Sequence, residues 1–180
     1  MMKEEETVNI LRHYRHDWMN QVQLLMGYAS MGKLDKVQDK LRESVESAER
    51  ERKLQNLNIP RTTIWLMSFN WHYDNFRIEY NVETEDKEQS INDQLLHSQF
   101  LGIMDVFSKY GMKFELYHGT ITIRPSMQIK GAEINLSFSG AFEQIDRLKQ
   151  AIIEKDDKYK LKIEQLSNGT YACNISWICS

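Results

Sequence analysis

The sequence predicts an α+β protein in which an N-terminal antiparallel helical hairpin is followed by an α/β sandwich. Three observations support this fold class. Residues 4–57 contain no proline and carry apolar side chains at helical spacing. Pro60 ends that pattern, because proline restricts the residue before it and rarely continues a helix. Beyond it, strand-like alternation is interleaved with helical stretches. We therefore expect two domains, at residues 1–58 and 59–180.

The two helices of the hairpin are separated by a break at Gly32-Lys33, and each carries one narrow apolar stripe. Spacings of three and four residues are typical of a coiled-coil seam or a bundle helix. A lone pair of helices buries too little apolar area, so we expect two copies to form a homodimer with a four-helix bundle. The stripe residues are Val8, Leu11, Trp18, Val22, Leu25 and Ala29 in the first helix and Leu34, Val37, Leu41, Val45 and Ala48 in the second.

The second domain is expected to alternate helices with strands, assigned from changes in the apolar period. Helices are expected at residues 62–73, which are rich in aromatic side chains, and at 91–109 and 142–155. Strands are expected at residues 76–82, 113–117, 120–124, 132–139, 159–166 and 170–178, with a charged loop at 83–89. Tight hairpins are expected about His118-Gly119 and Asn168-Gly169, because such glycine-containing pairs are typical of two-residue turns.

The bulk composition excludes several classes of partner. The formal net charge is -3 and the isoelectric point is near 6.0, so the chain lacks the basic surface of a nucleic-acid-binding protein. No apolar run approaches the roughly 18 residues that span a bilayer, and the first residues lack an apolar leader. We expect a cytoplasmic protein without membrane contact. Cys173 and Cys179 lie too far apart along one extended segment for a disulfide, so we expect both to be reduced and buried.

One segment of the first helix, residues 14–20, carries chemically informative side chains. At about 100° per residue, His16 points roughly 140° away from the centre of the apolar stripe, and Asn20 points nearly opposite that centre. The two side chains therefore share the outer face, one turn apart. Arg12 lies one turn before His16 on the same side. A histidine that fills a core would lie on the stripe, and this one does not.

The neighbours of His16 suit phosphoryl transfer. An exposed, neutral imidazole is a good nucleophile near pH 7. Asp17 can accept a proton from one ring nitrogen and leave the other free to attack. Arg15 or Arg12 can meet a phosphoryl oxygen, and Asn20 can donate a hydrogen bond to it. Position alone indicates only a surface histidine, and it is this combination of neighbours that favours a role in transfer.

The remaining histidines lack such neighbours. His13 also lies on the outer face and is the second candidate acceptor. We interpret His72, His97 and His118 as structural or surface residues.

The helix around His16 resembles the phospho-accepting helix of the sporulation initiation phosphotransferase B family, and the resemblance extends over nearly the whole chain. The Arg-His-Asp-x-x-Asn core alone is less specific, because citrate-type and quorum-sensing sensor kinases carry similar boxes. The matching runs are Arg15-His16-Asp17-Trp18-Met19-Asn20, Gln23-Leu24, Gly27, Lys53-Leu54-Gln55-Asn56-Leu57, Phe69-Asn70-Trp71 and Ser139-Gly140-Ala141-Phe142.

The resemblance implies a dimer that relays a phosphoryl group from a single-domain response regulator to a second regulator, a transcription factor that starts sporulation. His16 matches the phosphorylated histidine, and Arg15, Asp17 and Asn20 match its neighbours. The C-terminal domain would resemble a degenerate ATP-binding domain of a histidine kinase. No cofactor of its own is implied, since magnesium would belong to the acidic pocket of the regulator.

Two alternatives remain for the function. One is an ATP-dependent sensor kinase fragment, and the other is a non-catalytic dimer that binds a regulator or kinase. The first is disfavoured because residues 101–107 contain no asparagine to hold magnesium-ATP. In addition, Ser139-Gly140-Ala141-Phe142 stands where such kinases have an Asp-x-Gly-x-Gly box, and no phosphate-binding glycine motif occurs elsewhere.

Overall fold

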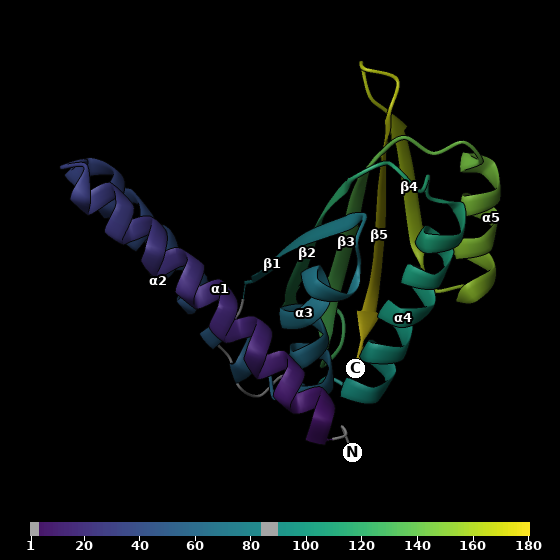
Figure 1. Cartoon of the computed structure of the whole chain (residues 1–180). Helices are drawn as coiled ribbons and strands as arrows, with labels where there is room; N and C mark the ends of the chain where they lie inside the picture. The colour runs from purple at the N-terminus through teal and green to yellow at the C-terminus, as the bar shows by residue number, and fades with distance from the viewer. Residues whose placement is uncertain (1–3, 84–89) are drawn as a thin grey trace. The chain divides into compact units, whose positions relative to one another are not determined.

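A computed structural model describes residues 4–83 and 90–180 of the chain, and its α+β architecture confirms the predicted fold class (Figure 1). Apart from Glu83, the charged loop expected at residues 83–89 lies outside the described residues. No helix in the described part is long and apolar enough to cross a membrane. The elements are α1 (Glu4–Ser30), α2 (Leu34–Asn56), α3 (Pro60–His72), β1 (Phe76–Val82), α4 (Asp93–Tyr110), β2 (Tyr117–Pro125), β3 (Ala132–Gly140), α5 (Ile145–Lys155), β4 (Lys160–Gln165) and β5 (Tyr171–Cys179).

Helices α1 and α2 form the predicted hairpin, and the break lies where glycine was expected to place it. Gly32 has a φ of 69°, a left-handed conformation that glycine adopts without steric cost. The amide of Lys33 donates to the carbonyl of Tyr28, and the amide of Gly32 donates to that of Ala29. These two bonds form a Schellman motif, which ends α1 and reverses the chain.

The apolar stripes of the hairpin are largely uncovered within one chain. Helix α1 contains no buried residue, and Leu11 of its stripe is 63% exposed. On α2, Leu34 is 66% exposed and Val45 is 63% exposed. Val22 and Leu25 are half-buried. A hairpin with so little buried apolar area lacks a core of its own.

Contacts between residues divide the chain into two units, Met1–Glu49 and Arg50–Ser180. The last part of α2 therefore belongs to the second unit. Leu54 and Leu57, together with Ile59 after the helix, are buried in the core of that unit. The division lies inside a continuous helix because only the C-terminal part of α2 packs its apolar side chains into that core.

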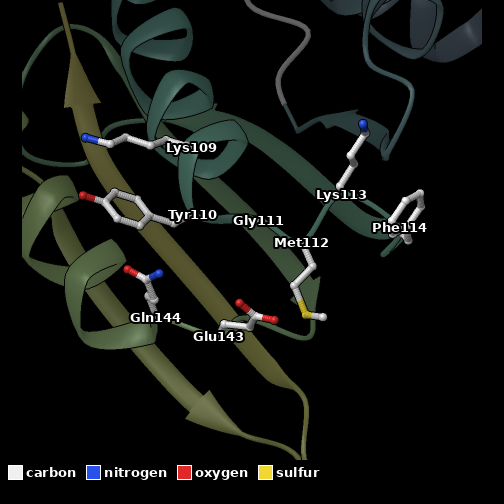
Figure 2. Close-up of a pocket in the computed structure, with 8 residues that line it drawn as sticks. All are labelled: Lys109, Tyr110, Gly111, Met112, Lys113, Phe114, Glu143 and Gln144. Carbon is white, nitrogen blue, oxygen red and sulfur yellow. The ribbon is translucent and has the colours of Figure 1, made fainter.

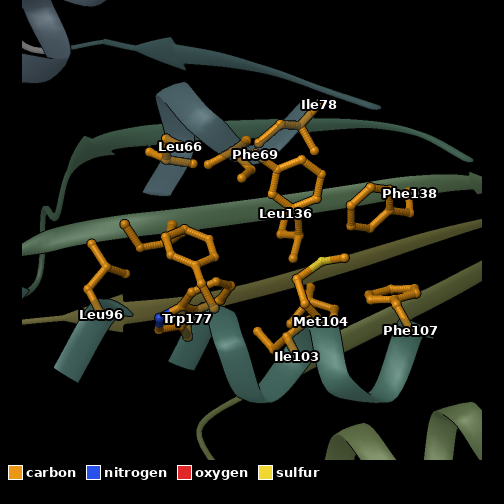
Figure 3. Close-up of a cluster of buried hydrophobic side chains, with 14 of the residues drawn as sticks. Leu66, Phe69, Ile78, Leu96, Ile103, Met104, Phe107, Leu136, Phe138 and Trp177 are labelled. Atoms are coloured by element: carbon orange, nitrogen blue, oxygen red, sulfur yellow. The ribbon is translucent and has the colours of Figure 1, made fainter. Parts of the chain in front are cut away.

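The second unit is a five-stranded sheet with strand order β1-β2-β3-β5-β4. Strands β1 and β2 are parallel, with α4 in the connection between them, and the other pairs are antiparallel. Alternate side chains of β2, β3 and β5 are buried, so one face of the sheet meets the helices (Figure 1). A single core fills the space between this face and the helices, with Met104 and Phe107 of α4 lying over Leu136 and Phe138 of β3 (Figure 3).

The hairpin predicted about His118-Gly119 is wrong. Residues 117–125 form one continuous strand, β2, and residues 113–116 form a turn and loop before it. Gly119 is needed inside the sheet, since a Cβ there would lie 2.4 Å from the ring of Phe138 and 2.7 Å from the carbonyl oxygen of Ser137. The glycine that suggested a turn instead admits a neighbouring aromatic ring. The second hairpin is confirmed, because Gly169 has a φ of 83° between β4 and β5.

Helix α3 is anchored at its first turn by a side chain from α4. Its N-cap residue, Ile59, offers no side-chain hydrogen bond. Instead, the carboxylate of Asp93 accepts from the amide of Arg61 at 2.8 Å, the amide of Thr62 at 2.9 Å and the hydroxyl of Thr62 at 2.8 Å. These bonds satisfy amides that a helix start leaves unpaired, and they fix α3 against α4.

Candidate functional site

His16 projects into solvent from the middle of α1. Its side chain is 71% exposed, and that of the adjacent Asp17 is 52% exposed. The helix is favoured here because Leu24, Leu25 and Met26 after the segment are good helix formers. At its start, Glu4, Glu5 and Glu6 complement the positive end of the helix dipole. Within one chain, the imidazole is therefore open to a docking protein.

Two side chains approach the same nitrogen of this imidazole. The Oδ1 atom of Asp17 and the Nδ2 atom of Asn20 each lie 3.3 Å from Nδ1 of His16. Asp17 can only accept, so it favours the tautomer with hydrogen on Nδ1. As oriented here, Asn20 donates and favours the opposite tautomer. No described residue bonds Nε2, so Nε2 carries a free lone pair that faces solvent when Asp17 holds the proton on Nδ1.

Neither of the arginines near His16 bonds to its imidazole. Arg12 lies on the outer face, but its guanidinium donates to Oδ1 of Asn9 at 2.9 Å. Arg15 is exposed, and among the described residues it makes no hydrogen bond or ion pair with His16. Neither guanidinium is therefore held at the imidazole.

The described residues contain no metal-binding cluster and no reactive cysteine that could serve as a second candidate site. Among residues 4–83 and 90–180, no cluster of histidine, cysteine and acidic side chains could hold a metal ion. The cysteines are free and buried, as expected, and burial raises the pKa of the Cys173 thiol to about 12. Burial also raises the pKa of Cys179. Neither residue therefore offers a thiolate near neutral pH.

A cavity of about 300 Å³ opens between the C-terminal end of α4 and the segment before α5 (Figure 2). Its lining residues are Lys109, Tyr110, Gly111, Met112, Lys113, Phe114, Glu143 and Gln144. The lining offers two ammonium groups and one carboxylate, but no histidine, serine or cysteine. It therefore contributes charge without a nucleophile for phosphoryl transfer.

The segment after β3 bonds to the protein's own side chains. The amide of Ala141 donates to Oε1 of Glu115 at 3.0 Å, and its carbonyl accepts from the hydroxyl of Tyr117. A Cβ on Gly140 would lie 2.4 Å from the ring of Tyr117. The backbone amide of Ala141 is therefore bonded to Glu115 and is not available to a phosphate.

The spacing of the residues anticipated part of this site. An i, i+4 relation predicted that His16 and Asn20 would be neighbours on one face. It did not reveal that Asp17 and Asn20 converge on one ring nitrogen, because this depends on side-chain rotamers. For the same reason, residue spacing could not predict that Arg12 turns toward Asn9.

Comparison with known proteins gives matches along nearly the whole chain. Residues 1–57 match the family described as "Sensor kinase SpoOB-type, alpha-helical domain", and residues 58–177 match "Sporulation initiation phospho-transferase B, C-terminal". Sporulation initiation phosphotransferase B of Bacillus subtilis (strain 168) is 33% identical over 137 residues, which cover 76% of this chain and 71% of the relative.

Two solved structures are similar at low identity. The catalytic domain of histidine kinase ThkA has a TM-score of 0.38 at 10% identity, with 68% of this chain and 93% of that chain covered. Histidine kinase ThkA in complex with response regulator protein TrrA also has a TM-score of 0.38, at 12% identity, with 99% of this chain and 64% of that chain covered.

Proposed function

The chain belongs to the sporulation initiation phosphotransferase B family, and on this premise we propose that it carries phosphoryl groups between two response regulators on His16. The donor is a single-domain response regulator, and the acceptor is a transcription-factor regulator that controls sporulation. The observation that carries this proposal is the solvent-exposed imidazole of His16, with Asp17 and Asn20 at its Nδ1 atom.

The transfer has two steps, each with a free-energy change close to zero. The lone pair of His16 Nε2 attacks the phosphorus of the donor's aspartyl phosphate in line. The bond between phosphorus and nitrogen forms as the bond to the aspartyl oxygen breaks, and the carboxylate leaves with its electron pair. Asp17 stabilises the positive charge that develops on the ring through its contact with Nδ1. The acceptor's aspartate then reverses the same chemistry.

This chain positions the His16 imidazole for the reaction and supplies no cofactor of its own. Phosphoryl transfer needs alignment and charge neutralisation, and the receiver's acidic pocket holds the magnesium at the aspartate. Arg12 and Arg15 lie on the same helix as His16 and can add positive charge once a phosphoryl group is bound. Asn20 can turn its amide toward a phosphoryl oxygen.

The proposal is tested with two purified receiver domains. A receiver labelled with radioactive phosphate should pass its label to this chain, and the product should be labile to acid and stable to alkali, as a phosphohistidine is. Addition of the second receiver should remove the label. Formation of a stable complex without any acid-labile label would instead support a non-catalytic regulator-binding dimer.

A change of Asp17→Asn should slow phosphoryl transfer roughly tenfold to a hundredfold, because an amide stabilises the developing imidazolium poorly. The bond is exposed and 3.3 Å long, so the effect should be smaller than that of removing the nucleophile. Single-turnover rates from a phosphorylated receiver measure the change. Asp39→Asn, at an exposed carboxylate on α2, is the control and should leave the rate unchanged. Equal rates for wild type and Asp17→Asn would remove Asp17 from the mechanism.

The proposed form of the protein is a homodimer, with the uncovered stripes of two hairpins packed into a four-helix bundle. Leu41 lies on the α2 stripe and is 49% exposed in one chain. A Leu41→Asp change would place an unpaired carboxylate in this seam, so the dimer dissociation constant should rise at least about a hundredfold. Sedimentation equilibrium measures it, with Arg42→Asp as the neighbouring control. A wild-type chain that sediments as a monomer at micromolar concentration would contradict the bundle.

A further inference from the structure

Arg15 is a charged residue on the otherwise apolar stripe of α1. It occupies the stripe position between Leu11 and Trp18. At about 100° per residue, its side chain points only about 40° from the centre of the stripe. The next residue, His16, points about 140° away from that centre. Arg15 therefore faces the seam of the proposed dimer, whereas the imidazole faces solvent.

The guanidinium of Arg15 makes no ion pair within the part of the chain that the structure describes. The positions one turn away in α1 hold no acid, since they are Leu11, Arg12, Trp18 and Met19. In one chain Arg15 is exposed, so water solvates its charge. A second hairpin that covers the stripe would remove much of this water, and an unpaired buried charge is strongly unfavourable. We therefore expect the dimer to supply a carboxylate at this point of the seam.

The half-buried residues of the hairpin show which side of each helix meets the other helix of the same chain. In α1, Leu25 and Tyr28 are half-buried. They point about 40° and 100° from the stripe centre, on the side away from Arg15. In α2, Lys40 and Ser44 are half-buried. They point about 100° and 60° from the centre of the α2 stripe, both on one side. The opposite side of each stripe is left to meet a second copy.

Glu49 is the carboxylate of α2 that lies on this second side, close to the stripe. Its side chain points about 80° from the stripe centre, whereas the other acids on that side point at least about 120° away. Arg15 precedes Gly32 by 17 residues and Glu49 follows it by 17 residues, so the two lie at the same height in the antiparallel hairpin. In a bundle with both hairpin turns at one end, Arg15 therefore lies level with the partner subunit's Glu49. Helix axes about 8–10 Å apart leave these long side chains within reach of each other.

We propose that Arg15 forms an ion pair with the partner subunit's Glu49 across the dimer seam. By the two-fold symmetry of a homodimer, Glu49 forms the same pair with the partner subunit's Arg15. Charged pairs beside an apolar seam set partner choice and orientation in helical bundles, so these two pairs hold both hairpin turns at one end. This inference rests on the homodimer of the proposed function and narrows the role of the arginines. With Arg15 engaged at the seam, Arg12 is the arginine left to add positive charge beside a phosphoryl group.

The test uses two full-length charge-reversal variants, each alone and both mixed. Arg15→Glu sets two carboxylates against each other at both pairs, and Glu49→Arg sets two guanidinium groups there. In each homodimer both pairs are repulsive, so the dissociation constant from sedimentation equilibrium should rise at least about thirtyfold. An equimolar mixture restores an attractive pair at both places, but only between unlike chains. Differently tagged variants should therefore form heterodimers with a dissociation constant within about threefold of the wild-type value.

Glu46→Arg is the matched control, since Glu46 is exposed and points about 140° from the centre of the α2 stripe. Alone it should dimerise as wild type does. Mixed with Arg15→Glu it leaves one repulsive pair, so that heterodimer should be at least about fivefold weaker than the one formed with Glu49→Arg.

Three results would overturn the pair between subunits. The first is unchanged dimerisation of both Arg15→Glu and Glu49→Arg. The second is a failure of the mixture to form heterodimers. The third is recovery in a chain that carries both changes but not in the mixture, which would place the pair within one chain. A wild-type chain that remains monomeric would overturn the homodimer itself, and this inference with it.

Discussion

Replacement of His16 by glutamine should reduce phosphoryl transfer by about a thousandfold or more, because a glutamine amide nitrogen is not a nucleophile and cannot replace the attacking imidazole nitrogen. Glutamine keeps a polar side chain of similar length on the outer face. Since the His16 side chain is 71% exposed, the free energy of unfolding should change by no more than about 0.5 kcal/mol. The rate of label transfer from a phosphorylated receiver and the circular dichroism melting curve measure the two effects.

His13→Gln is the matched control for this experiment, because His13 is the other histidine of α1 and is also exposed. It should transfer at the wild-type rate. Loss of transfer in His13→Gln with retention in His16→Gln would identify His13 as the phosphoryl acceptor. Loss of transfer accompanied by unfolding of His16→Gln would mean that His16 has a structural role, contrary to its exposure.

A Gly119→Val change should destabilise the second unit by about 3 kcal/mol or more. A Cβ at this position would lie 2.4 Å from the Phe138 ring and 2.7 Å from the Ser137 carbonyl oxygen, so the sheet would have to shift. Small domains have only about 5–15 kcal/mol of stability, so this loss should be plain in urea unfolding. Val is otherwise a favourable strand residue, and the expected loss therefore reports steric contact rather than propensity.

Gly102→Ala provides the contrast, because a Cβ there would meet the nearest atom, Cδ of Lys155, at 3.9 Å, an ordinary contact. In the interior of α4 this change should stabilise the protein by up to about 1 kcal/mol. Near-neutral behaviour of Gly119→Val would indicate that residue 119 lies in a turn, as the sequence pattern suggested, and would contradict a continuous β2.

Local patterns in the sequence predicted most of the fold. Alternation of apolar residues placed β1 at residues 76–82, and the glycine at position 32 placed the break between α1 and α2. Pairing across the sheet was harder to foresee. The parallel pairing of β1 with β2 depends on the connection through α4, and the role of Gly119 depends on Phe138 in another strand. Such contacts are distant in sequence, so a local turn signal at His118-Gly119 was misleading.

The candidate site could be anticipated in outline for the same reason. Helical periodicity alone places His16 and Asn20 on one outward face, opposite the stripe. Periodicity does not set side-chain rotamers, so the convergence of Asp17 and Asn20 on Nδ1 could not be predicted from the sequence.

The most direct test of phosphoryl transfer through His16 is to locate the phosphoryl group itself. The chain would be labelled by a phosphorylated receiver, digested under alkaline conditions that preserve phosphohistidine, and mapped by tandem mass spectrometry. We predict that the added phosphoryl mass lies on His16 alone and disappears when the second receiver is added. A phosphoryl group on His13, on a residue of the second unit, or on no residue of this chain would contradict the account.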